Sequence, residues 1–499
     1  MLTRGFGVFV LGVGLLSAPG CGDDDDADGN PSAGGAGAAG GNPSGAGRGG
    51  ANTGGGAGAS NGGKPAGTNG GSPGLGGDAN ALGGTQNPTG GTSSTITAGE
   101  AGAPLGGNTQ GYGGNADSGG NTDIGGNHFG GGGDEPGVGG AGGQESGRDA
   151  DPACAAATPT ALAGNGTVAS PYLICTPAQL KLIGTGAYTT ALAYALGDDL
   201  ALDTLAEPFV TIPEFTGKLD GRARSIAGLT TPLIEQLGTA GEISSLQVSG
   251  NVVSDRGMLL RTNNGTVRRV FATGTLRATN HAGLIAGRNA GLIEDCASAG
   301  VVAVVEDGAR AHIGGLVGRN LSGIIRRCRS TTQVTGVGRT GGLVGTQDAG
   351  SIEQSVAIAT VKTPDLASTP PGIGGLLGTL FGGTLINCYA RSSVMANNAG
   401  GLVGNFEYPN TAAKIENSYA ASALSGTGTQ GLLGGVTGDA SLLQITNAYY
   451  LDTHSDSYGA PLSAADLGTQ GKLVGWDFAT VWRIVPATSA YPLLAWEVP

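Results

Sequence analysis

The 499-residue sequence predicts an all-β fold, a right-handed parallel β-helix that follows a long disordered Gly-rich stalk. A short motif that recurs between Gly283 and Gly431 indicates the β-helix. The stalk is indicated by 101 glycines, most of which precede Asp151. Only 5% of the residues are aromatic and 13% are charged, a balance that favours stacked small residues over a globular enzyme core.

The first 20 residues predict an export signal. One positive charge precedes an apolar run from Gly5 to Leu16, which is too short to span a bilayer comfortably. The small residues before Cys21 resemble the lipobox of bacterial lipoproteins, although Ala18 and Pro19 depart from its Leu-rich pattern. This resemblance implies a lipid on Cys21 and a protein anchored to the bacterial outer membrane or cell surface. The alternative is an ordinary signal peptide cut near Ala18, which leaves Cys21 free.

Residues 21–151 predict a flexible linker. Gly, Ala, Asn, Ser and Asp dominate this segment, and such a composition cannot bury an apolar core. A Gly-rich coil of about 130 residues has a root-mean-square reach on the order of 60 Å. The formal net charge of the chain is -13, without a basic stripe, so nucleic acid is not expected as a partner.

The repeat motif is a Gly-Gly-Leu-Val-Gly sequence with close variants. The glycine before its leucine stands at Gly283, Gly315, Gly342, Gly375, Gly401 and Gly431. A second element follows each motif, in residues 291–296, 323–328, 350–355, 383–388, 413–418 and 443–448. Each interval predicts one rung, so we expect an N-terminal cap with the first rungs at 152–256, repeats at 257–450 and a C-terminal cap at 451–499.

Alternating residues predict the strands that follow the second element. Small side chains such as Cys328 and Ser330 are expected inside, and Arg329 and Thr331 outside. Stacked rungs place equivalent residues in columns. One column reads Arg268, Glu294, Arg326 and Glu353, and the next reads Arg269, Asp295 and Arg327. Alternating charge suits neighbouring strands, so we interpret these columns as structural.

The motifs resemble those of the GLUG-motif repeat proteins, which occur in bacterial adhesin-like surface proteins. The resemblance covers roughly residues 160–499. It extends beyond the repeats to an opening segment, a short capping helix, first rungs and a closing segment, at 164–174, 176–180, 196–200, 215–222, 449–452, 475–478 and 491–496. It implies a capped β-helix on a cell surface.

The cysteines of the folded part form two groups. Cys154 and Cys175 flank the start of the domain and predict a disulfide that fixes the N-terminal cap in an oxidising compartment. Cys296, Cys328 and Cys388 share one repeat position and are expected as small buried residues. The first two lie on adjacent rungs, close enough to bridge, and the sequence leaves the redox state of all three open.

The sequence predicts no catalytic, metal-binding or cofactor-binding residues. Some GLUG-motif proteins carry zinc metallopeptidases that cut immunoglobulin A1, but the four histidines here form no His-Glu-x-x-His motif. The alternative is a polysaccharide lyase or hydrolase. Arg326, Arg327, Arg329 and Arg339 would hold a uronate in such an enzyme, although their acidic neighbours favour a neutral charged face.

Three tyrosines and three asparagines predict a ligand-contact strip. Each tyrosine follows an inward residue and is expected to point outward, beside the asparagine two residues earlier. The strip comprises Tyr389, Tyr419, Tyr449, Asn387, Asn417 and Asn447. Sugars stack on such rings, so we expect contact with a glycan or a host or matrix glycoprotein, and a function in adhesion. The alternatives are that the ladder only stabilises the fold or lies under a loop, in a purely structural surface protein.

Overall fold

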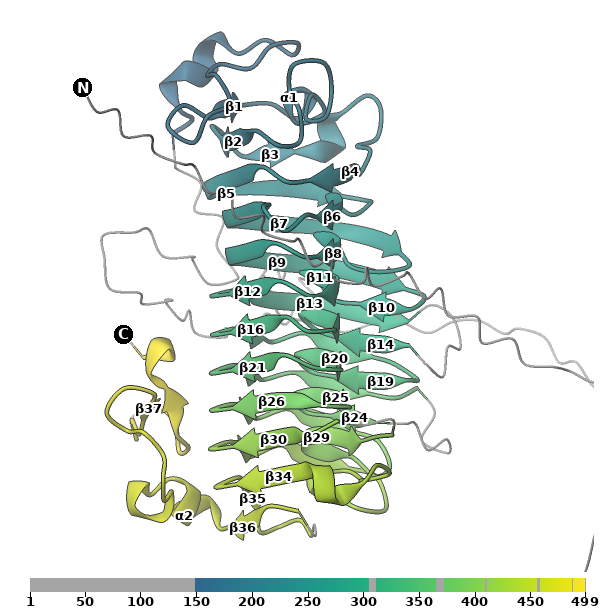
Figure 1. Cartoon of the computed structure of the whole chain (residues 1–499), viewed down its shortest axis with the longest axis vertical. Helices are drawn as coiled ribbons and strands as arrows, with labels where there is room; N and C mark the ends of the chain where they lie inside the picture. The colour runs from purple at the N-terminus through teal and green to yellow at the C-terminus, as the bar shows by residue number, and fades with distance from the viewer. Residues whose placement is uncertain are drawn as a thin grey trace, which may run out of the picture. The chain divides into compact units, whose positions relative to one another are not determined.

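The computed structural model describes residues 149–304, 311–364, 372–408, 411–455, 458–486 and 488–498. These residues form a parallel β-helix, as predicted (Figure 1). The predicted signal peptide, Cys21 and nearly all of the predicted linker lie outside the described residues. Within the described ranges, no helix combines the length and apolar character needed to cross a membrane.

The larger sheet has 23 strands, which pair in parallel. Its early strands are long because each continues through the corner of its rung as one strand. They are β5 (Lys218–Leu229), β7 (Glu242–Ser254) and β9 (Thr266–Ala278). Later rungs divide the same path into shorter strands. These are β12 (Leu292–Glu294), β13 (Ala297–Val304), β16 (Ile324–Arg326), β17 (Arg329–Ser330), β18 (Gln333–Thr335), β21 (Ser351–Glu353), β22 (Val356–Ala357), β23 (Thr360–Lys362), β26 (Gly383–Ile386), β27 (Tyr389–Ala390), β28 (Ser393–Met395), β30 (Ala413–Glu416), β31 (Tyr419–Ala420), β32 (Ala423–Ser425), β34 (Leu443–Thr446) and β35 (Tyr449–Leu451).

The second sheet has 13 strands, and the Gly-Leu-Val-Gly motif makes the bend between its paired segments. A Cβ on Gly345 would overlap the backbone of Ile313, so glycine is required where the preceding rung lies directly against this strand. The strands are β4 (Ile212–Phe215), β6 (Ile234–Leu237), β8 (Leu260–Asn263), β10 (His281–Ala282), β11 (Ala286–Asn289), β14 (His312–Gly314), β15 (Val317–Asn320), β19 (Arg339–Gly341), β20 (Val344–Gln347), β24 (Ile373–Gly374), β25 (Leu377–Leu380), β29 (Gly400–Phe406) and β33 (Gly431–Leu433).

Aliphatic side chains fill the interior in columns. Ile293, Ile325, Ile352, Leu385 and Ile415 stand in register on consecutive rungs, and each is fully buried. Burying such a side chain contributes on the order of 2 kcal/mol. The second element of each repeat therefore supplies one core residue per rung.

Each rung turns a corner at a residue with positive φ. The asparagines predicted to flank the tyrosines occupy this corner, with φ of 55° at Asn387, 46° at Asn417 and 50° at Asn447. Asn tolerates this left-handed conformation better than most residues, because its short side-chain amide can form hydrogen bonds with the nearby backbone. Earlier rungs place Asp295 and Arg327 at the same corner.

The N-terminal end is closed by short elements. Helix α1 (Pro177–Leu180) begins after Thr176, whose side chain accepts a hydrogen bond from the Gln179 amide. The other elements are η1 (Pro152–Ala156), β1 (Tyr172–Ile174), β2 (Ala193–Leu196), β3 (Leu200–Ala201) and η2 (Leu202–Thr204).

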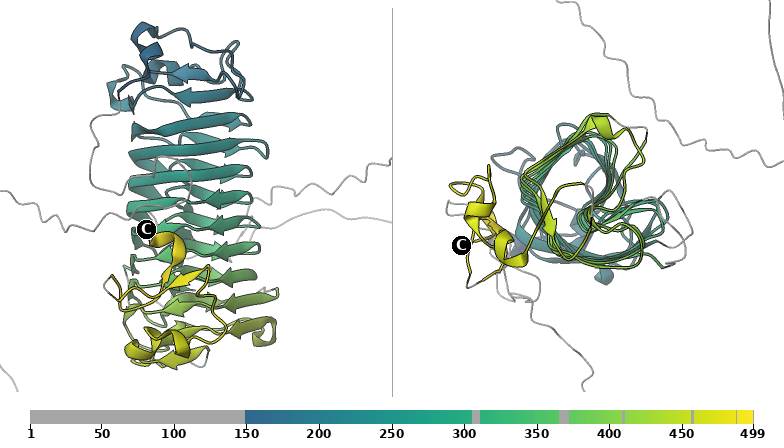
Figure 2. Two further views of the ribbon diagram at one scale, coloured as in Figure 1. Left: turned by 90° about the vertical axis from the view of Figure 1, so that its left-hand side faces the viewer. Right: turned by 90° about the horizontal axis from the view of Figure 1, so that it is seen from below.

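The C-terminal segment folds back along the side of the β-helix (Figure 2). After β36 (Ala460–Leu462) the chain forms α2 (Ala464–Leu467), and β37 (Trp482–Arg483) pairs antiparallel with β38 (Leu493–Leu494). We call residues 464–498 the strap. A closing segment was predicted at 451–499, but its main part covers the flank of the last rungs rather than their end.

Candidate functional site

The predicted tyrosine strip lies beneath the strap. Tyr389 and Tyr419 are fully buried and Tyr449 is 8% exposed. The first two rings stack with 4.9 Å between centroids and 5° between planes. Strap residues Trp476 and Trp482 pack on them. The rings lie outside the main interior cluster, but the prediction that they face solvent is wrong, because the chain's own tryptophans remove this apolar surface from water.

Polar contacts fix the end of the strap on the same tyrosines. The Tyr389 hydroxyl donates to the Glu497 carboxylate, 3.0 Å from each oxygen. The Tyr419 hydroxyl donates to the Pro492 carbonyl at 2.7 Å. Burial raises the pKa of Glu497, although a backbone amide and the charge of Arg329, 3.6 Å away, oppose that rise. The strap therefore ends in a buried, hydrogen-bonded carboxylate.

Two of the three asparagines, Asn387 and Asn447, also contact the strap. The Trp482 indole donates to the Asn387 side-chain oxygen at 3.3 Å, and the Trp476 indole donates to the Asn447 carbonyl at 3.0 Å. Asn447 donates to the Asn417 side-chain oxygen at 3.1 Å, so two of the three amides are joined across neighbouring rungs. The prediction that Asn387 and Asn447 contact a ligand is wrong for the same reason as for the tyrosines, because the strap contacts both residues. Asn417 is half-buried between them and contacts Asn447.

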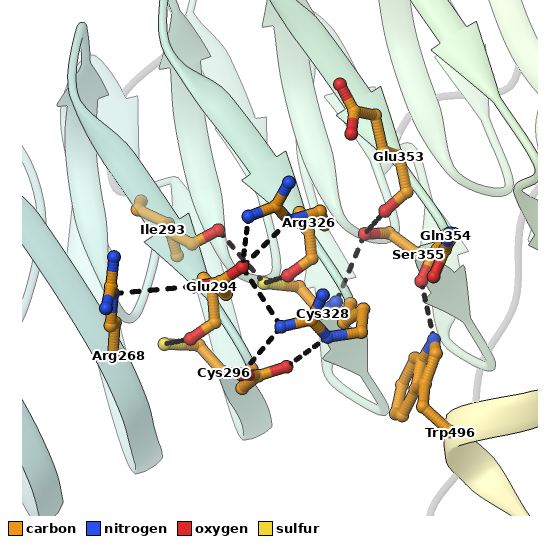
Figure 3. Close-up of polar contacts among 12 residues, drawn as sticks. Arg268, Ile293, Glu294, Cys296, Arg326, Cys328, Glu353, Gln354, Ser355 and Trp496 are labelled. Atoms are coloured by element: carbon orange, nitrogen blue, oxygen red, sulfur yellow. Dashed lines mark hydrogen bonds and ion pairs between the residues drawn. The ribbon is translucent and has the colours of Figure 1, made fainter. Parts of the chain in front are cut away.

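The predicted charge columns form ion pairs across the rungs (Figure 3). Glu294 contacts Arg326, Arg327 at 3.0 Å and Arg268 at 3.4 Å. Arg327 also binds Asp295 at 2.6 Å. Burial raises the pKa of Glu294, but its hydrogen bond to Arg326 and the surrounding charges outweigh burial and lower it overall. The carboxylate is therefore kept ionised as a structural link between three rungs.

The other two arginines considered for uronate binding are paired as well. Arg329 contacts Glu497 of the strap. Arg339 donates to both oxygens of Glu407 at 2.9 Å, and its guanidinium lies 5.1 Å from the centre of the Phe381 ring. A ligand carboxylate would have to displace a protein carboxylate from each of these arginines.

The three repeat cysteines line the interior as free, fully buried thiols. Burial raises the pKa of Cys388 to about 12 and that of Cys328 well above its usual value. Thiolate chemistry is therefore suppressed in the folded chain. Cys154 and Cys175, by contrast, are joined in a disulfide with Cα atoms 5.4 Å apart.

A buried ladder of asparagine amides, which the sequence did not predict, joins three rungs. Asn263 donates to Asn289 at 2.7 Å, and Asn289 donates to Asn320 at 2.8 Å. All three are fully buried. The signal was present in the repeat, because Gly-Arg-Asn occurs at residues 287–289 and again at 318–320.

Two histidines form a second unpredicted feature. His281 and His312 stand in register on β10 and β14, with ring centroids 4.8 Å apart and planes 20° apart. Burial lowers the pKa of both, to about 2 for His312, and nearby arginines add to the effect. The lowered pKa values keep both rings neutral near pH 7. Among the described residues, no group of His, Cys, Asp and Glu has the arrangement of a metal site.

Two rows of side chains on the outer face of the larger sheet remain exposed or half-buried. The outer row follows the register Asn251, Thr275, Val301, Gln333, Thr360, Ser393 and Ala423. The rim row beside it contains Val253, Arg277, Ala303, Thr335, Lys362, Met395 and Ser425. Both rows run across the rungs as flat strips.

Comparisons with known proteins match only part of the chain. No protein-family model matches it. It is 32% identical over 146 residues to halomucin of Haloquadratum walsbyi, which covers 25% of this chain and 2% of halomucin. It is 31% identical over 139 residues to a Gly-rich membrane protein of Evansella cellulosilytica, which covers 27% of this chain and 13% of that protein. The chain thus spans a small fraction of either relative.

Among solved structures, an IgA1 protease matches with a TM-score of 0.35 and 17% sequence identity. The match covers 52% of this chain and 20% of the protease chain.

Proposed function

We propose that this chain is an exported, lipid-anchored bacterial surface protein whose β-helix binds glycan chains without cleaving them. The observation that carries the binding function is the outer row, a strip of hydroxyl and amide groups that the strap leaves uncovered. The biological role is adhesion, and the surface that contacts the glycan is the outer row, because the strap covers the tyrosines.

The spacing of the outer row suits an extended polymer. Neighbouring rungs are about 4.8 Å apart, so Gln333, Thr360 and Ser393 offer hydrogen-bonding groups at that interval. All three side chains are exposed. Met395 of the rim row is 47% exposed and provides an apolar contact for a sugar face. A chain lying along the strip can thus meet several rungs at once.

The rim row adds positive charge to an acidic protein. Arg277 and Lys362 are exposed on this row, and neither forms an ion pair with another described residue. Three rungs separate them, which corresponds to about 14 Å. Carboxylate or sulfate groups of an acidic glycan would be attracted to this edge.

Two features support export and anchoring: the first 21 residues of the sequence and one disulfide. The apolar run followed by small residues and Cys21 is typical of lipoprotein signals, and the Cys154–Cys175 disulfide suits an oxidising compartment. The names of the two partial relatives, a halomucin and a membrane protein, are compatible with this location. The repeat motifs support membership of the GLUG-motif group.

The absence of cleavage is part of the proposal. General acid–base cleavage of a glycan needs carboxylates free to change protonation beside the bond. Glu294 and Glu407 are instead engaged by arginines, and no described carboxylate stands in the outer row or the rim row.

The test is retention of the full chain on immobilised neutral and acidic polysaccharides and matrix glycoproteins, with release of products scored in the same assay. We expect retention without products, and loss of retention in the triple variant Gln333→Ala, Thr360→Ala, Ser393→Ala. The matched control replaces three exposed polar residues outside the rows, Gln236→Ala, Gln444→Ala and Thr446→Ala. Product release would contradict the non-enzymatic function, and no retention on any surface would favour a purely structural protein.

A further inference from the structure

We propose that Cys296 and Cys328 are a disulfide-forming pair that links two neighbouring rungs when the protein folds in an oxidising compartment. The structure holds both as free thiols. They are direct neighbours in the stack, because the flanking residues pair in register, Glu294 with Arg326 and Ala297 with Arg329. Both belong to the same interior cluster.

The separation of the two backbones suits a disulfide. Paired strands lie about 4.8 Å apart, and bridged cysteines have Cα separations of about 4.4–6.8 Å. The two cysteines are thus close enough for a bridge without movement of the backbone.

The two thiols lean in the same direction along the stack. Cys328 donates to the Ile293 carbonyl at 3.6 Å, so its sulfur faces the rung of Cys296 (Figure 3). Cys296 donates to the Val267 carbonyl at 3.7 Å and faces the rung before. Rotation of the Cys296 side chain about its Cα–Cβ bond is the change that brings the sulfurs together.

Cys388 is a natural internal control. It is equally buried and makes the same kind of bond, to the Ile352 carbonyl at 3.4 Å. Its neighbours in the column are serines, Ser355 on one side and Ser418 on the other. Two rungs, about 9.6 Å, separate it from Cys328, which exceeds the reach of a disulfide.

The bond must form before the rungs close. A thiolate is the attacking species, and burial holds the Cys328 pKa well above its usual value once the core is packed. A disulfide-bearing oxidoreductase is the oxidant. One cysteine thiolate attacks the oxidant disulfide and gives a mixed disulfide, and the second cysteine then displaces the oxidant. The pair loses two protons and two electrons, and the oxidant is reduced to a dithiol.

The proposal rests on the proposed export, since it needs the compartment that oxidises Cys154 and Cys175. The test is peptide mapping without reductant on the full chain exported to a bacterial periplasm, after alkylation of free thiols in denaturant. We expect a peptide pair joined through Cys296 and Cys328, lighter by two hydrogens than the separate peptides. Cys388 should be alkylated.

The variant Cys296→Ser provides the matched control. Serine occupies the same column on two other rungs, so this variant is expected to fold and to leave Cys328 open to alkylation. Reduction should lower the Tm of the wild type more than that of Cys296→Ser. Alkylation of Cys296 and Cys328 to the same extent as Cys388 overturns the proposal. If Cys154 and Cys175 are linked in that sample, only the present inference fails; if they are also free, the proposed export fails with it.

Discussion

At the scale of single residues, the column of Cys and Ser side chains explains how each tight corner is tolerated. Ser355 accepts a hydrogen bond from the Cys328 amide at 3.1 Å, and Ser418 accepts one from the Cys388 amide at 3.0 Å. The residue before each of these cysteines, Arg327 or Asn387, has a positive φ. This turn directs the cysteine amide toward the serine on the following rung. At Ser355 and Ser418 the column therefore combines small size with a hydrogen-bond acceptor, whereas Ala448 supplies small size alone.

Substitution of Ser355 tests the role of this acceptor. Ser355→Ala removes the acceptor of a buried amide, so we expect a loss of about 1–3 kcal/mol in the free energy of unfolding. Ser355→Cys keeps a weak acceptor of similar size and should cost clearly less. The measurement is denaturant unfolding with reductant present. Equal effects of the two substitutions would show that side-chain volume alone matters at this position.

The sequence predicted the contents of this column but not its purpose. The sequence shows that small residues recur at this repeat position. The direction of a backbone amide, by contrast, depends on the φ of the residue before it. The same limit applies to His281 and His312. They belong to no zinc motif, and their stacking depends on the register between β10 and β14, which the sequence does not give directly.

The buried histidines predict a dependence of stability on pH. Burial lowers the pKa of His312 to about 2, far below the value of about 6.5 in an unfolded chain. The unfolded state therefore binds protons that the folded state does not, and stability falls as the pH drops below about 6.5. Between pH 7.5 and 5.0 each such histidine should cost about 2 kcal/mol. The measurement is the free energy of unfolding across this range.

His281→Phe keeps a ring in the stack but removes one titrating group. Its loss of stability between the same two pH values should be smaller than that of the wild type by about 2 kcal/mol. The comparison of the two proteins cancels groups that titrate in the opposite direction, such as Asp348 and Glu497, whose pKa values are raised mainly by burial. If the wild type and His281→Phe lost the same free energy of unfolding between the two pH values, His281 would not be kept neutral by the fold.

At the scale of elements, the rungs and the existence of a closing segment were predictable, but the position of the strap on the flank was not. Period, inward columns and charge alternation are local properties of each repeat, and the structure places them accordingly. The contact between Tyr389 and Glu497 joins residues 108 positions apart, and no periodicity links them. The outward direction of Tyr389 was predicted, but an outward aromatic ladder is compatible with either solvent or a covering segment.

The hydrogen bonds beneath the strap predict unequal effects of two similar substitutions. Tyr389→Phe leaves the buried Glu497 carboxylate without its hydroxyl donor and should cost about 1.5–3 kcal/mol. Tyr419→Phe removes a bond to the neutral Pro492 carbonyl and should cost about 1 kcal/mol. All three tryptophans of the chain lie in the strap, so their fluorescence reports its release during denaturant titration. A larger effect of Tyr419→Phe would contradict the importance assigned to Glu497.

At the scale of the whole molecule, the strap gives a one-dimensional stack a long-range connection. A solenoid rung contacts mainly its neighbours, so its stability is a sum of local terms. The strap instead touches Gln354, through a bond of 2.8 Å from the Trp496 indole, and reaches as far as Tyr449. The rungs between these points are all covered by the strap. The apolar cluster that the strap forms with the β-helix contains no residue of β5, β7 or β9.

This asymmetry predicts how the molecule responds to loss of the strap. A chain that ends at residue 463 exposes Val356, Tyr389, Tyr419 and Tyr449, so the rungs that carry them should lose protection against amide hydrogen exchange. The rungs of β5, β7 and β9 serve as the internal reference and should keep theirs, because their neighbours are unchanged. A uniform loss of protection would mean that the β-helix unfolds as one cooperative unit, and no loss would mean that the strap only covers a surface that is stable without it.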